Sequence, residues 1–255
     1  MIRRRHYSIR TEKSYVSWIK RFILFHNKRH PKDLGPREIE EYLTHLAENR
    51  RVSASTQNQA FNAILFLYEQ VLRVDADFEI NAVRAKRPQR MPSVLTRSEA
   101  NQVIEAMSGP EGLVVRLLYG SGLRLSEALR LRVRDLDFEM NQILVRDAKG
   151  QKDRVTLLPE SVRRPLKKQL VYARGLHRED LSKGFGRVAL PNALARKYPN
   201  AEKEWSWQYV FPASRTYREL DTGVVRRHRL HESTVQRALR RAALGTEIAK
   251  PVHAA

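Results

Sequence analysis

The stretch from Tyr119 to Arg154 reads YGSGLRLSEALRLRVRDLDFEMNQILVRDAKGQKDR, and it decides the fold of the surrounding domain. Two glycines end an apolar segment, and Leu125, Ala128 and Leu129 then recur at helical spacing, which predicts a new helix opening at Arg124. An arginine at a helix N-terminus suits an anion. Free backbone N–H groups point outward there, and a guanidinium can hold two phosphate oxygens.

A β-hairpin is predicted directly after this helix. Apolar residues 143–145 and 155–158 flank a polar turn around Gly150, and Lys149 lies in that turn. Taken singly, each basic residue has an ordinary explanation. An arginine in a helix is usually solvated, and a lysine at a hairpin tip usually keeps the sheet edge soluble.

The order of these motifs, G-L-R at a helix start and then A-K-G in a hairpin, resembles the catalytic core of the tyrosine recombinase (phage integrase) family. The resemblance implies that Arg124 neutralises charge on the scissile phosphate of DNA, and that Lys149 donates a proton to the leaving 5′-hydroxyl. It also implies DNA breaking and rejoining through a phosphotyrosyl intermediate, with no metal or other cofactor, by a homotetramer on paired sites.

Composition indicates an anionic partner. The 255 residues include 48 Lys and Arg against 28 Asp and Glu, a formal net charge of +20, and such a surface gains affinity for phosphate backbones by counterion release. The absence of cysteine excludes disulfides and a thiolate nucleophile. No apolar run has the length of a membrane span, and the N-terminus lacks the apolar region of a signal peptide, so we expect a cytoplasmic protein.

We predict three parts and a mostly helical α+β fold with a small antiparallel sheet. Residues 1–83 carry helical apolar patterns and many basic residues, and the resemblance equates them with the SAM-like core-binding domain of the family. Residues 84–97 have five basic residues, no acidic ones and two prolines, which indicates a linker. Residues 98–255 form the predicted catalytic domain, and Thr96 and Glu99 give its first helix a capping box.

An insertion is expected at about residues 187–212. A short helix is predicted over 190–198, and Trp205, Trp207, Tyr209 and Phe211 then alternate with other residues as in a strand with an aromatic face. Such a face normally packs on a core, but one or two of these rings could instead stack on extruded bases. The segment is similar to the extra-helix region of integron integrases, which implies gene-cassette sites, including single-stranded hairpin sites, as partners.

The two histidines His228 and His231 stand just before another predicted helix, and their spacing is compatible with a metal site. No carboxylate or cysteine cluster accompanies them, so we predict no metal there.

The second half of the family's active site has no match in this sequence. The His-x-x-Arg pair, a later His or Trp and the tyrosine nucleophile would follow AKPVHAA, so we expect a catalytic domain truncated before them, which binds DNA but does not cleave it alone. We interpret Tyr172, Tyr198, Tyr209 and Tyr217 as packing residues. Two alternatives remain: a non-catalytic competitor of a full-length recombinase at its sites, or an unrelated basic nucleic-acid-binding protein.

Overall fold

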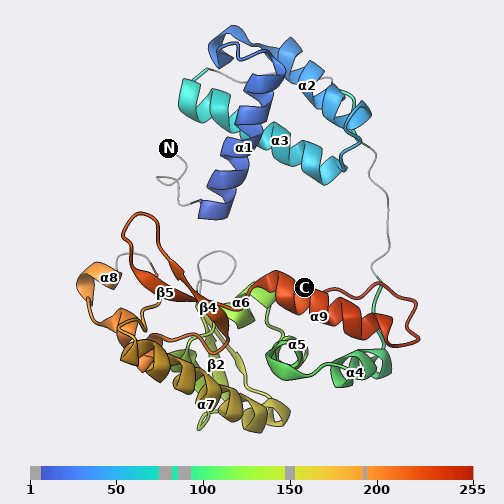
Figure 1. The fold of residues 1–255 in the computed structure, drawn as a ribbon. Coiled ribbons are helices and arrows are strands. Elements are labelled where there is room, and N and C mark those ends of the chain that lie inside the picture. Colours follow the sequence, from blue (N-terminus) through green and yellow to red (C-terminus); the bar gives the residue numbers. More distant parts are fainter. Residues whose placement is uncertain (1–6, 75–81, 86–92, 147–152, 192–193, 255) are drawn as a thin grey trace. The chain divides into compact units, whose positions relative to one another are not determined.

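The computed structural model describes residues 7–74, 82–85, 93–146, 153–191 and 194–254. The chain divides into two compact units, Met1–Met91 and Pro92–Ala255. Both are drawn in Figure 1, and each is described here by itself. No described helix is both long enough and apolar enough to cross a membrane.

The first unit is a helical bundle. Its helices are α1 (Ile9–Phe25), α2 (Pro36–Glu48) and α3 (Ala54–Phe66), and a π-helical turn (Leu67–Leu72) continues α3. The helical apolar pattern predicted within residues 1–83 is confirmed in α2, where the four apolar residues at helical spacing are the buried ones: Ile39, Tyr42, Leu43 and Leu46. Ser8 caps α1 by accepting a hydrogen bond from the Thr11 amide at 3.1 Å.

A buried amide fastens the end of this unit. The Gln57 side chain on α3 is 1% exposed, donates to the carbonyls of Leu43 (2.9 Å) and Val83 (2.7 Å), and accepts from the Ala85 amide (3.0 Å). An amide side chain satisfied on both ends in this way specifies one path for the backbone around it. Gln57 therefore holds the chain at residues 83–85 against α2 and α3.

The second unit combines helices with two small sheets (Figure 1). Its elements in order are α4 (Arg97–Glu105), α5 (Gly109–Ser121), α6 (Leu125–Arg130), β1 (Leu136–Asp137), β2 (Gln142–Val145), β3 (Arg154–Leu157), α7 (Glu160–Ser182), α8 (Leu194–Lys197), β4 (Pro212–Arg218), β5 (Val225–Arg229) and α9 (Glu232–Leu244). The capping box predicted at the start of α4 is confirmed. The Thr96 amide donates to Glu99 at 2.7 Å, and the Glu99 amide donates to the Thr96 hydroxyl at 3.2 Å.

The predicted hairpin is confirmed as β2 and β3. They pair antiparallel from Gln142 opposite Leu157 to Val145 opposite Arg154, and the two-residue β1 adds a third strand beside β2. Ile143 and Val145 point into the core, which they share with α5, α6, α7 and α9.

The strand predicted over Trp205–Phe211 is wrong. Residues 205–207 form a 3₁₀ turn, and only Tyr209 makes an isolated bridge, to Arg132. An alternating strand has one covered face, whereas here all five residues from 207 to 211 are buried, because protein surrounds the segment. Within the described residues of 190–198, the predicted helix is present as α8, at 194–197.

Helix α7 and the hairpin of β4 and β5 were not predicted from the sequence. The hairpin of β4 and β5 projects from the body of the unit (Figure 1), and its arginine-rich strands lack an apolar alternation. Helix α7 is highly charged, and its buried side includes His177 and Asp180 among few apolar residues. A pattern search for amphipathic elements depends on apolar periodicity, so these elements escape it.

His177 is a buried histidine on α7. The side chain is 5% exposed, its ring lies 6.0 Å from the Trp205 ring, and its buried Nδ1 has no hydrogen-bond partner among the described residues. Burial lowers the pKa of His177 below 6.5, although the Lys203 backbone and the charge of Asp180 act the other way. The folded protein thus disfavours the protonated ring.

We therefore expect the contribution of neutral His177 to the free energy of unfolding to be complete above pH 6.5. It should fall as the pH is lowered toward the folded-state pKa of His177, because the unfolded chain binds the proton more readily. Denaturant unfolding at about pH 7.5 and about pH 5.5 measures this difference, which should shrink in His177→Leu. His228→Leu, which removes an exposed histidine of β5, is the control and should leave the difference intact. An undiminished difference in His177→Leu would contradict the assignment.

Candidate phosphate-binding site

Arg124 stands where the sequence predicted it, at the start of α6. It occupies the N-cap position, with extended backbone, and Leu125 is the first helical residue. An arginine side chain has no acceptor for the free amides of a helix start. The cap is completed instead by Glu127, whose carboxylate accepts a hydrogen bond from the Arg124 backbone amide at 2.9 Å.

The same carboxylate orients the Arg124 side chain. Nη1 of Arg124 lies 2.8 Å from Oε1 of Glu127, and the side chain of Glu127 is 7% exposed while that of Arg124 is 53% exposed. Burial alone would raise the pKa of the Glu127 carboxyl, but hydrogen bonds from Arg124 and the charges of Arg154 and Arg124 outweigh it, so this pKa is lowered. Glu127 is therefore an anion, and the guanidinium it holds remains open to solvent.

A second guanidinium shares this carboxylate. Arg154, at the start of β3, places Nη2 2.7 Å from Oε2 of Glu127, and its side chain is 36% exposed. Two positive charges on one negative charge leave a surplus positive charge at the surface. Sequence reasoning missed both Arg154 and Glu127. The i,i+3 spacing of Glu127 from Arg124 was a usable signal, whereas the role of Arg154 depends on the pairing of β3.

Lys149 lies outside the described residues. The described pairing of β2 and β3 ends at Val145 opposite Arg154, and the segment that contains Lys149 joins these two residues. The proposed role of Lys149 thus stays a prediction.

An apolar cavity of about 600 Å³ opens beside the two arginines. Arg124 and Arg154 line one part of it. Residues 252–254 and side chains of α4, α5 and α9 line other parts, among them Val103, Ile104, Val115, Leu118 and Leu239. Apolar walls beside the guanidiniums lower the local dielectric and strengthen the attraction of an anion to them.

The residues around the insertion form their own small core. Trp207, Tyr209, Val188 and Ala201 are buried together, with Leu190 and Leu194 packed against them. For Trp207 and Tyr209 this packing explains the aromatic pattern. Trp205 is only half-buried.

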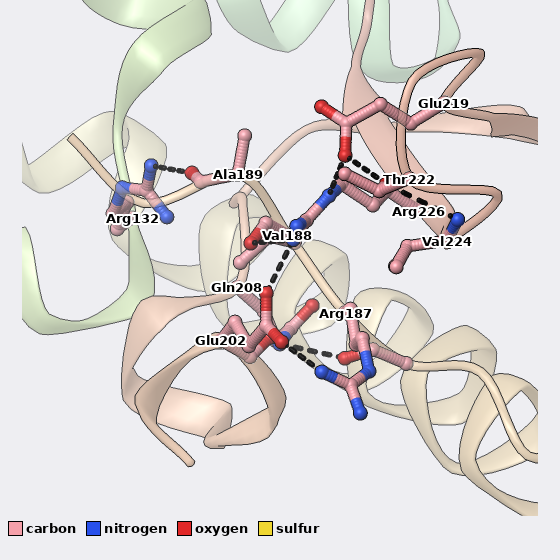
Figure 2. Close-up of polar contacts among 11 residues, drawn as sticks. Arg132, Arg187, Val188, Ala189, Glu202, Gln208, Glu219, Thr222, Val224 and Arg226 are labelled. Atoms are coloured by element: carbon pink, nitrogen blue, oxygen red, sulfur yellow. Dashed lines mark hydrogen bonds and ion pairs between the residues drawn. The ribbon is translucent and has the colours of Figure 1, made fainter. Parts of the chain in front are cut away.

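A buried carboxylate ties this core to the projecting hairpin. Glu202 is 6% exposed and forms ion pairs with Arg187 and with Arg226 of β5, and Arg226 also contacts Glu219 at 3.3 Å (Figure 2). On the other side, Arg227 of β5 binds Asp180 of α7 through two nitrogens at 2.6 and 2.7 Å.

The histidines considered for a metal have other contacts. The Ser233 amide donates to Nδ1 of His231 at 3.1 Å, so His231 caps α9, and the His228 ring lies near those of Tyr209 and Tyr217. Within the described ranges, no group of three or more His, Asp or Glu side chains is placed to hold a metal ion.

The interpretation of four tyrosines as packing residues holds only for Tyr209, which is 9% exposed. Tyr172, Tyr198 and Tyr217 are 53%, 48% and 38% exposed. Helix α7 turns Tyr172 outward, and the other two lie at the edge of the insertion and on the projecting hairpin.

Two solved structures with a similar fold are integrases bound to DNA. The Tn1549 transposon integrase in complex with transposon right end DNA has a TM-score of 0.62 at 16% identity, and the match covers 98% of this chain and 78% of that one. A lambda integrase tetramer bound to a Holliday junction has a TM-score of 0.57 at 16% identity, covering 96% of this chain and 60% of that one. The fold is therefore that of the tyrosine recombinases.

Sequence comparison defines the family. Residues 1–77 match the N-terminal SAM-like domain of phage integrases, and residues 93–254 match the phage integrase family. An integrase/recombinase of Escherichia coli is 45% identical over 250 residues, which are 98% of this chain and 74% of the relative. The chain belongs to the phage integrase family.

Proposed function

We propose that this protein binds recombination-site DNA and holds one backbone phosphodiester at Arg124 during site-specific DNA recombination. The observation that carries the proposal is the half-exposed guanidinium of Arg124, anchored on its inner side by the buried carboxylate of Glu127. Preorganised charge of this kind stabilises a phosphoryl transition state without reorganising when the reaction occurs.

Arg154 supports the same proposal. Its guanidinium contacts the second oxygen of Glu127, so one carboxylate holds two arginines. The three side chains together carry a net positive charge. A phosphodiester carries a single negative charge and matches that surplus. In the family chemistry that we propose here, a tyrosine oxygen replaces the 5′-oxygen on phosphorus and loses its own proton to solvent, while Lys149 protonates the leaving 5′-oxygen. No tyrosine of this sequence is matched to that role.

We propose gene-cassette sites as the DNA, including single-stranded hairpin sites. The support is the insertion, which folds as a separate small core and leaves Trp205 and Tyr198 partly exposed, where a protruding base could stack. The lambda integrase relative is a tetramer on a Holliday junction, and we propose a homotetramer on paired sites here as well.

Arg124→Ala is expected to weaken binding to cassette-site DNA and to flatten its salt dependence. Loss of one phosphate contact lowers the slope of log Kobs against log salt concentration by about 0.9 on duplex DNA. Fluorescence anisotropy between about 50 and 200 mM salt measures both quantities. Arg130→Ala, at the exposed far end of α6, is the matched control, and equal slopes for Arg124→Ala and the unsubstituted protein would remove the assigned role.

A second candidate function is a non-catalytic DNA-binding protein that competes with a full-length recombinase. It is favoured by the lack of a sequence match to the family's nucleophilic tyrosine among the nine tyrosines of the chain. Incubation with a nicked suicide site distinguishes the two functions. A covalent protein–DNA adduct supports cleavage, whereas a footprint without an adduct supports the competitor.

A further inference from the structure

Arg132 is a buried arginine just beyond the C-terminus of α6. It is 8% exposed, and its guanidinium donates to two backbone carbonyls of the insertion, those of Trp207 at 2.6 Å and Ala189 at 2.8 Å. Figure 2 shows the second of these bonds. One planar group therefore holds two segments of the insertion that lie far from α6 in the sequence.

Aromatic rings complete the environment of this cation. The guanidinium carbon lies 4.7 Å from the centre of the Tyr209 ring and 5.5 Å from that of Trp207. Burial lowers the pKa of Arg132, while Tyr209 and the charge of Asp135 favour the protonated guanidinium and oppose this effect. Asp135 does not bond the guanidinium in the described contacts. It accepts from the Arg132 backbone amide at 2.9 Å and from Arg146 at 2.8 Å.

Backbone hydrogen bonds also join the segment after α6 to the insertion. The Val133 amide donates to the Gln208 carbonyl, and the Val210 amide donates to the Leu131 carbonyl, both at 3.0 Å. The segment that leaves α6 is thus joined to the insertion on both sides of Arg132.

Helix α6 is short, and both of its ends are held by charged groups. It has six residues, so isolated helical stability cannot fix it, and its position depends on tertiary contacts. Glu127, shared with Arg154, fixes the end that presents Arg124. Arg132 fixes the other end onto the insertion.

We propose that Arg132 is a positioning residue that couples the insertion, at about residues 187–212, to the presentation of Arg124. The inference rests on the proposed function, because it assigns Arg124 to a DNA phosphate. DNA bound by the insertion and a phosphate bound by Arg124 would contact opposite ends of the short helix α6. Arg132 connects the insertion to this helix.

The test replaces Arg132 with methionine, which fills similar space but leaves the Trp207 and Ala189 carbonyls without their donor. We expect affinity for cassette-site DNA to fall about tenfold and the salt slope to decrease by close to 0.9, as for Arg124→Ala. In Arg124→Ala/Arg132→Met the slope should equal that of Arg124→Ala alone, because the second change acts through the first residue.

Arg134→Met is the matched control. Arg134 is exposed, and its guanidinium carbon lies 4.2 Å from the centre of the Trp207 ring, so its replacement should leave the Arg124-dependent part of the slope intact. Arg132→Lys keeps the charge but loses the planar fork, and should recover only part of the slope. If Arg132→Met does not fold by near-UV circular dichroism, Arg132→Lys is used for the same double-mutant comparison.

The outcomes separate the inference from the function it rests on. An Arg132 variant with an unchanged slope, or with a decrease that persists in full in the Arg124→Ala background, would overturn the coupling. If Arg124→Ala itself leaves the slope unchanged, the proposed function fails first. A decrease that disappears in the Arg124→Ala background supports Arg132 as the coupling residue.

Discussion

Glu202→Gln is expected to lower the free energy of unfolding of the second unit by about 3–5 kcal/mol, the range for removing one partner of a buried ion pair. The Glu202 side chain is 8% exposed and holds Arg187 and Arg226, of which Arg226 is only 15% exposed. Without the negative charge of Glu202, the positive charges of these two guanidiniums repel each other. Arg226 retains Glu219 at 3.3 Å, which is not enough to offset the loss.

The pH dependence of this effect has a defined sign. Burial raises the pKa of the Glu202 carboxyl, but hydrogen bonds and charges of Arg226 and Arg187 outweigh it, and the net pKa lies below 4.5. The contribution of Glu202 is therefore complete above pH 4.5 and is lost as the pH falls through the lowered folded-state pKa. The difference in stability between the Gln variant and the unsubstituted protein should narrow in that acidic range.

Denaturant unfolding followed by circular dichroism measures the loss. The matched control is Glu179→Gln, which breaks an exposed i,i+4 pair with Lys183 whose side chains are 56% and 57% exposed. That change should cost no more than about 0.5 kcal/mol. Equal effects of the two substitutions would show that Glu202 does not act as a buried anion.

Asp180→Asn is expected to cost about 3 kcal/mol, at the lower end of the range for a broken buried pair. Asp180 and Arg227 are 6% and 11% exposed and form a two-point contact at 2.6 and 2.7 Å. Arg227 keeps the carbonyls of Ala213 at 2.7 Å and Ser214 at 2.9 Å, which moderates the loss.

The same unfolding measurement tests this change, with Asp221→Asn in the exposed turn between β4 and β5 as the control. That control should remain within about 0.5 kcal/mol of the unsubstituted protein. Neighbouring residues of a strand point to opposite faces, so the ion pairs of Arg226 and Arg227 hold β5 on both of its faces. A loss below about 1 kcal/mol in Asp180→Asn would mean that the ion pair of Asp180 with Arg227 contributes little to stability.

Local patterns predicted the elements that are marked by a fixed spacing of apolar or capping residues. The buried residues of α2, the capping box of Thr96 and Glu99, and the β2–β3 hairpin are all confirmed. In each case the residues that signal the element are the ones that stabilise it. The strand predicted over Trp205–Phe211 is wrong because alternation indicates one covered face, whereas consecutive residues from 207 to 211 are all buried.

By itself, the sequence determined the short-range part of the site. Arg124 begins a helix, and Glu127 lies one turn later, so the cap and the ion pair follow from a spacing of three residues. The tertiary structure alone decided the other partners. Arg154 reaches Glu127 across 27 residues, and Arg132 reaches Ala189 and Trp207 across 57 and 75. Periodicity records which face of an element is buried, but it does not record which distant element covers that face, because packing of the whole unit sets those contacts.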